Sequence, residues 1–75
     1  MKTPGRRTLR RVTVLLIPGV AGELDTIGRR ARLSDTDIVN RAISLYNFVD
    51  KELDSGAQLL LYRPRSGLAE EVQLR

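Results

Sequence analysis

The sequence contains no cysteine, no histidine and no tryptophan, and its aromatic residues are two tyrosines and one phenylalanine. Without cysteine the chain cannot form a disulfide, and without cysteine or histidine it lacks the commonest zinc ligands. The same absences remove the thiolate nucleophile and the usual base that titrates near neutral pH. The sequence therefore predicts neither an enzyme, nor a metal site, nor a bound cofactor.

The chain is also short, with 75 residues and a mass of 8.4 kDa. A domain of this size buries only about 60% of the surface that its unfolded chain exposes, and small domains usually add a disulfide, a metal or a partner subunit. Of these, a partner subunit is the one that this composition allows. The longest apolar runs, 14–17 and 59–62, are far below the ~18 residues of a membrane span, so we expect a soluble, cytoplasmic protein without a membrane partner.

Positive charge is concentrated at the N-terminus. The chain carries 13 basic and 9 acidic residues, a net charge of +4. Residues 1–19 contain no acid, and their basic residues are Lys2, Arg6, Arg7, Arg10 and Arg11. Such an arm indicates contact with phosphate groups, because electrostatics dominates the affinity of proteins for nucleic acids. A solvated leader without contacts remains the alternative for residues 2–7.

A secretory signal is a further interpretation of this N-terminus, since basic residues precede the stretch 12–17, which is apolar except for Thr13. The apolar segment of a signal extends over ~7 to 15 residues, whereas Arg11 and Pro18 bound this shorter run. Cleavage would also leave a small remnant without a disulfide framework. We therefore expect no cleaved signal.

Residues 10–17 have the alternation of a β-strand, with many β-branched and aliphatic side chains. One face contains Val12, Val14 and Leu16. The other face contains Arg11, Thr13 and Leu15. Pro18 and Gly19 end the strand, because proline lacks the amide donor that a sheet requires and glycine permits a sharp turn.

An amphipathic helix is predicted over about 20–31. Its apolar stripe consists of Val20, Leu24, Ile27 and Ala31. Gly22 and Gly28 each lower its intrinsic stability by ~1 kcal/mol relative to alanine, so this helix depends on packing.

The strongest helix signal begins at Ser34, a favourable N-cap that Asp37 follows at capping-box spacing. The helix should extend to about 53 or 54 and stop at Ser55-Gly56. Its apolar positions are Ile38, Val39, Ala42, Ile43, Leu45, Tyr46, Phe48, Val49 and Leu53. This arc is too wide for the neighbours that one small chain provides, so we expect the helix to pack against a second copy of itself.

The C-terminal extension, 55–75, is predicted to form a β-hairpin. Its strands are 58–62 and 69–74, and Pro64 and Gly67 mark the turn over 63–67. Two roles remain open for its apolar residues: they cover the exposed end of the preceding helix, or they offer a sheet edge to another dimer or another protein. Higher-order assembly of dimers on DNA is therefore open as well.

This order of a strand, a short helix, a turn ending in Leu33-Ser34 and a second helix resembles the ribbon-helix-helix family of bacterial, plasmid and phage DNA-binding proteins. The resemblance covers residues 10 to about 50. It implies a mainly helical α+β fold of β-α-α order, in which two chains form an intertwined homodimer. The chain then divides into a basic arm (1–9), a dimerisation and DNA-binding domain (10–54) and the hairpin extension (55–75). The expected dimer core contains Val12, Val14, Leu24, Ile27, Val39, Ala42, Ile43 and Tyr46.

In this family the strands of two chains pair into an antiparallel ribbon that enters the major groove of DNA. The resemblance assigns base contacts to Arg11, Thr13 and Leu15. Arginine can bind guanine O6 and N7 in bidentate fashion, and threonine offers both a hydroxyl and a methyl group. Leu15 departs from the polar residue that is usual at its position, so contact with a thymine methyl group and contact with protein both remain open.

A second family contact is a backbone phosphate at the start of the second helix, where unpaired amides favour an anion. Here the resemblance assigns Ser34 and Thr36, with Arg32 beside them. The remaining expected phosphate contacts are Lys2, Arg6, Arg7 and Arg10. Asp35 opposes an anion at this place, and helix capping alone remains the alternative for Ser34.

The sequence thus predicts a homodimeric, sequence-specific transcriptional repressor that binds double-stranded DNA and is associated with the nucleoid. The alternative is an antitoxin-like interaction module, whose core mainly dimerises and whose C-terminal hairpin binds a protein partner.

Overall fold

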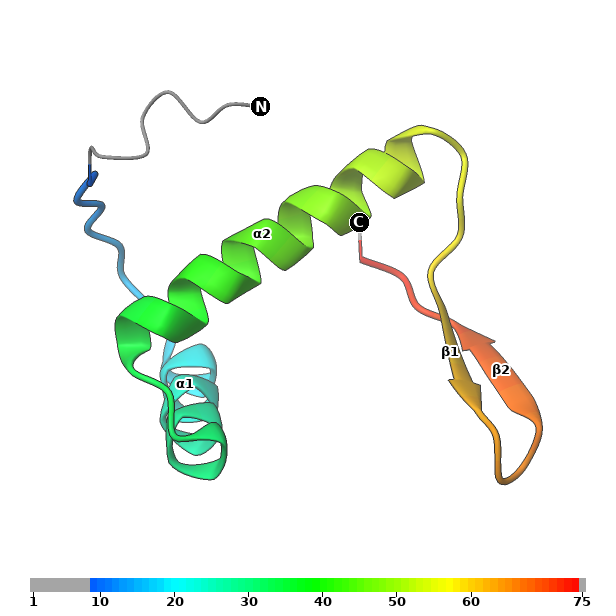
Figure 1. The fold of residues 1–75 in the computed structure, drawn as a ribbon, viewed down its shortest axis with the longest axis horizontal. Coiled ribbons are helices and arrows are strands. Elements are labelled where there is room, and N and C mark those ends of the chain that lie inside the picture. The colour runs from blue at the N-terminus through cyan, green and yellow to red at the C-terminus, as the bar shows by residue number, and fades with distance from the viewer. Residues whose placement is uncertain (1–8, 75) are drawn as a thin grey trace.

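The computed structural model describes residues 9–74, which form two helices followed by a β-hairpin (Figure 1). Helix α1 spans Pro18–Ala31 and helix α2 spans Asp35–Asp54. Strands β1 (Leu60–Arg63) and β2 (Leu68–Glu71) form the hairpin. The expectation of a small, mainly helical α+β chain is confirmed. The expected phosphate contacts Lys2, Arg6 and Arg7 lie outside the described residues.

The strand predicted over 10–17 is wrong for the single chain. Residues 9–17 form neither helix nor strand, and they leave α1 at the end of the molecule that lies away from the hairpin (Figure 1). A strand requires a neighbour that accepts its ladder of hydrogen bonds, and β1 and β2 bond to each other. The element order of one chain is therefore α-α-β-β. A ribbon formed by residues 10–17 of two chains stays a prediction.

Helix α1 begins at Pro18, two residues earlier than the apolar stripe indicated. Proline suits the first helical position, because the first amides of a helix have no partner within the helix and the ring fixes a helical φ. The carbonyl of Ile17, in extended conformation, accepts from the amide of Ala21 at 2.9 Å. At the other end, Arg32 has a positive φ of 57°, and the amides of Arg32 and Leu33 both donate to the carbonyl of Gly28.

Both predicted ends of α2 are confirmed. The hydroxyl of Ser34 accepts a hydrogen bond from the amide of Asp37 at 3.1 Å, which satisfies one of the free amides at the helix start. At the C-terminus, Gly56 has a φ of 100°. Its amide donates to Leu53, and the amide of Ala57 donates to Glu52, each at 3.0 Å. This pair of bonds is a Schellman motif, which ends a helix at a left-handed glycine.

The C-terminal hairpin is confirmed, with strands shorter than predicted. Its antiparallel register pairs Leu60 with Glu71, Leu61 with Glu70, Tyr62 with Ala69 and Arg63 with Leu68. Residues paired directly across two strands lie on the same face. One face of the hairpin therefore presents Leu60 and Tyr62, and both of these side chains are exposed.

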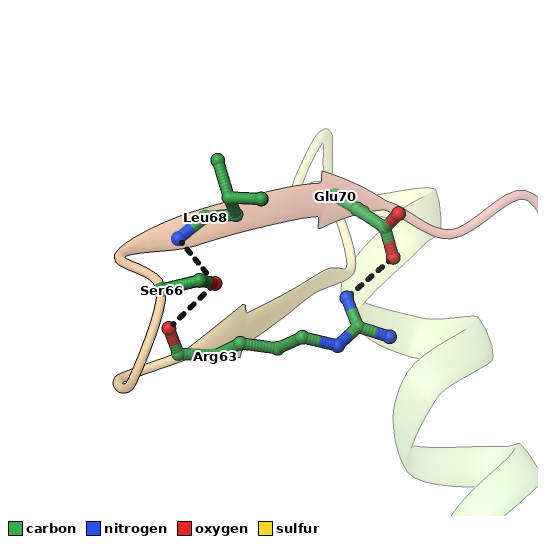
Figure 2. A network of polar contacts seen from close by, with 4 residues as sticks. All are labelled: Arg63, Ser66, Leu68 and Glu70. Atoms are coloured by element: carbon green, nitrogen blue, oxygen red, sulfur yellow. Dashed lines mark hydrogen bonds and ion pairs between the residues drawn. The ribbon is translucent and has the colours of Figure 1, made fainter.

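A compact polar network closes the hairpin turn (Figure 2). The carbonyl of Arg63 accepts from the amides of Ser66 at 3.2 Å and Gly67 at 2.8 Å, and the hydroxyl of Ser66 accepts from the amide of Leu68 at 3.3 Å. The guanidinium of Arg63 pairs with the carboxylate of Glu70 at 2.7 Å across the strands. Gly67 has a φ of 74°, a left-handed conformation that glycine adopts without strain.

The described residues of a single chain, 9–74, form no buried core. Not one described residue is buried, although α1 approaches α2 closely at Gly28, where an added side-chain carbon would lie 3.7 Å from Cδ1 of Ile38 on α2 and 3.3 Å from the carbonyl oxygen of Leu33 in the turn. The radius of gyration is 15.7 Å, whereas a compact chain of this length would have about 11 Å. The helices and the hairpin therefore form an open arrangement with exposed apolar faces.

Candidate nucleic-acid interface

The expected base contacts lie along the extended segment that precedes α1. Arg11, Thr13 and Leu15 are all exposed. Leu15 is 98% exposed, whereas its neighbour Leu16, on the face predicted to be apolar, is 42% exposed. Within residues 9–74, neither Arg10 nor Arg11 forms an ion pair, so both guanidinium groups are available to an external anion.

Three of the expected phosphate contacts lie where the turn between α1 and α2 meets the start of α2: Arg32 and Ser34 in the turn, and Thr36 in the first turn of α2. The fourth described one, Arg10, lies on the segment before α1. Helix geometry leaves the amides of Asp35 and Thr36 without partners inside α2, while the Ser34 hydroxyl occupies the amide of Asp37. Two backbone donors and the positive end of the helix dipole thus face solvent at this point. The carboxylate of Asp35 is exposed at the same helix start and opposes an anion there.

The backbone of Arg32 is a feature that sequence reasoning missed. A left-handed conformation costs a non-glycine residue about 1 to 2 kcal/mol, and the position after a helix is commonly glycine for this reason. Here the chain places an arginine at φ 57° and ψ 47°, directly between the two helices. The run Arg30 to Ser34 contains no glycine or asparagine that could have marked this turn. This left-handed residue therefore carries a cationic side chain two residues before Ser34, the N-cap of α2.

The positions of the expected dimer core are not brought together in one chain. Leu24 and Ile27 are half-buried on α1. The other members are exposed: Val12, Val14, Val39, Ala42, Ile43 and Tyr46. The exposed members therefore form an unpartnered apolar surface along α2 and along the segment 9–17, which precedes α1.

Two shallow hollows at the end of α2 were not foreseen from the sequence. One has no room for a water molecule and is lined by Tyr46, Val49, Asp50, Leu53 and Leu74. The other has room for about 160 Å³ and is lined by Phe48, Val49, Glu52, Leu53, Ala57, Gln58 and Leu59. We call the second one the Phe48 hollow. The loop after α2 forms one wall of this hollow, with Ala57, Gln58 and Leu59. The helical periodicity of the sequence does not indicate where that loop lies.

Neither a metal cluster nor a membrane span is found in the described part of the chain. No group of three or more carboxylate side chains there could hold a metal ion. Neither α1 nor α2 is long and apolar enough to cross a membrane.

No family model, curated protein or solved structure matches the chain.

Proposed function

We propose that two copies of this chain form a homodimer that binds double-stranded DNA and regulates transcription. One observation carries the proposal: residues 10–17 alternate between two kinds of face, all of them are exposed, and no strand within residues 9–74 pairs with them. Pairing with the same segment of a second copy supplies the missing hydrogen bonds. It also turns Val12 and Val14 to one side of the ribbon and Arg11 and Thr13 to the other.

The exposed area of the chain supports dimerisation. A compact monomer of 8.4 kDa exposes about 4,600 Å², whereas this chain exposes 7162 Å², a surplus of about 2,500 Å². Obligate dimers bury about 2,000 to 5,000 Å² over both partners. Two copies together carry a surplus of about 5,000 Å², which lies at the upper end of that range.

The chemistry of the exposed groups supports DNA as the ligand. A two-stranded ribbon fits the major groove, and arginine and threonine are side chains that read base edges there. Arg10, Arg32 and the open amides at the start of α2 offer contacts to backbone phosphates. In this proposal the base-contact residues provide sequence specificity, and the phosphate-contact residues position the protein on the duplex.

A second candidate function is supported by the hairpin. Leu60, Leu61, Tyr62 and Leu68 are all more than half exposed, although a two-stranded hairpin alone is at best marginally stable in water. In this alternative the hairpin binds a protein partner and the helical core serves mainly to dimerise.

Arg32→Gly tests the proposed phosphate contact, because it should change stability and DNA affinity in opposite directions. Glycine relieves the left-handed strain, so the free energy of unfolding should rise by about 0.5 to 1 kcal/mol. Binding to duplex DNA should weaken, and the log–log salt slope should flatten by up to ~0.9 for each phosphate that the protein no longer neutralises, or ~1.8 per dimer. Thermal unfolding and fluorescence anisotropy over a salt series measure the two effects.

The matched control is Arg30→Ala, which removes the same charge from the exposed surface of α1. It should leave the salt slope nearly unchanged. Equal slopes for Arg32→Gly and the parent protein would show that Arg32 does not contact the DNA backbone.

A further inference from the structure

The two hollows at the end of α2 lie on different flanks of the helix. Tyr46 lines one and Phe48 lines the other, and residues two positions apart in an α-helix are separated by about 200° around its axis. Val49 and Leu53 line both hollows and form the ridge between them. A second copy packed on the Tyr46 flank therefore leaves the Phe48 flank uncovered.

The Phe48 hollow has the size and chemistry of a site for one apolar side chain. Its room of about 160 Å³ is below the about 300 to 1,000 Å³ of pockets that hold small-molecule ligands. Phe48, Leu53 and Leu59 supply an apolar lining. Glu52 adds a carboxylate that forms no ion pair within residues 9–74. The matching occupant is a bulky apolar side chain with a cation beside it.

The segment before α1 carries such a side chain. Leu9 is 95% exposed, and Arg10 and Arg11 follow it directly. Neither arginine forms an ion pair with a described residue. Leu15, which is equally exposed, has no charged residue within three positions on either side. Leu9 with Arg10 is therefore the complementary pair for the apolar lining and the carboxylate of the Phe48 hollow.

The occupant must come from another copy of the chain. In Figure 1 the segment 9–17 and the hairpin stand at opposite ends of α2. A helix of 20 residues is about 30 Å long, and the segment runs away from it rather than along it.

We infer that the Phe48 hollow docks Leu9 of a second copy, with Arg10 of that copy pairing with Glu52. The contact joins unlike surfaces: made reciprocally by two copies it closes a dimer, and made in one direction it links one dimer to the next. It uses arginines that the proposed function assigns to DNA, and DNA therefore competes with docking. The inference itself does not rest on DNA binding, and its test contains no DNA.

The test uses a synthetic peptide of residues 4–13 as the probe, titrated into the isotope-labelled 75-residue protein and followed by two-dimensional NMR. The protein carries Leu9→Asp, so that its own exposed segment does not compete. Amide shifts should concentrate at Phe48, Glu52, Ala57 and Leu59. A peptide with Leu9→Asp should bind at least about tenfold more weakly, since it lacks the apolar anchor.

A charge exchange tests the ion pair. Protein with Glu52→Arg should lose affinity for the parent peptide and regain it for a peptide with Arg10→Glu. The matched control, Glu23→Arg on α1, should bind the parent peptide as before. Absence of shifts at the hollow would overturn the inference, as would equal binding of the Leu9→Asp peptide, which would indicate non-specific charge attraction. Failure of the proposed DNA-binding function would leave all of these results unchanged.

Discussion

The double substitution Arg11→Ala and Thr13→Ala is expected to abolish the preference for a cognate DNA site while the fold and the dimer persist. Both side chains are exposed in the chain, and in a ribbon they point away from Val12 and Val14. Removal of each bidentate arginine contact should cost ~1 to 3 kcal/mol, and a two-fold dimer has two of them. Affinity for non-specific DNA should change much less, because phosphate contacts supply it.

The measurement compares the dissociation constant for the cognate site with that for random duplex DNA at one salt concentration. The control variant, Thr26→Ala with Arg29→Ala, removes the same two side-chain types from α1 and should keep the preference. Leu15→Ala should matter only where a thymine lies at the contacted step. If the double variant binds the selected site as tightly as the parent protein, the interaction-module hypothesis becomes the better account.

Ile43→Asp is expected to unfold the chain rather than to release a folded monomer. Ile43 is exposed in the single chain, but in the proposed dimer it lies in the shared core. A carboxylate placed there must be desolvated without a partner, at a cost of several kcal/mol in each subunit. Since no described residue is buried in one chain, a separated subunit has no core to keep it folded.

Sedimentation and far-ultraviolet circular dichroism, recorded over a range of protein concentrations, measure this effect. The parent protein should sediment as a dimer, with helicity that falls on dilution together with its mass. Ser44→Asp places the same charge on the polar side of α2 and should leave the dimer intact. A well-folded monomer at micromolar concentration, for either the parent protein or the Ile43 variant, would contradict the proposed assembly.

The parts of the fold that local chemistry determines were predictable from the sequence. Ser34 and Gly56 mark the two ends of α2, because a hydroxyl at the N-cap and a left-handed glycine after the last turn satisfy the free groups of a helix wherever it lies. Pro64 and Gly67 located the hairpin turn, because proline fixes a φ that suits a turn and glycine adopts a left-handed φ without strain.

The parts that depend on distant partners were not predictable. Alternation over 10–17 is a property of the chain, but the strand itself requires a neighbour, and residues 9–74 of a single chain provide none. The two strands of the hairpin are shorter than the segments predicted from the sequence, 58–62 and 69–74. One hydrogen bond continues beyond them, from the amide of Val72 to the carbonyl of Leu59 at 2.8 Å. The Phe48 hollow depends on how the loop at 57–59 lies against α2, and the strained backbone of Arg32 has no sequence signal.

Selection of bound fragments from random duplex DNA by the 75-residue parent protein tests the central claim most directly. A homodimer that reads DNA with a two-fold ribbon should enrich a palindromic or regularly repeated consensus, because each half of the dimer contacts the same sequence. Mutation of one half-site should then weaken binding by ~1 to 3 kcal/mol for each mismatched base pair. Recovery of fragments with no shared sequence, or no recovery at all at low salt, would contradict the account.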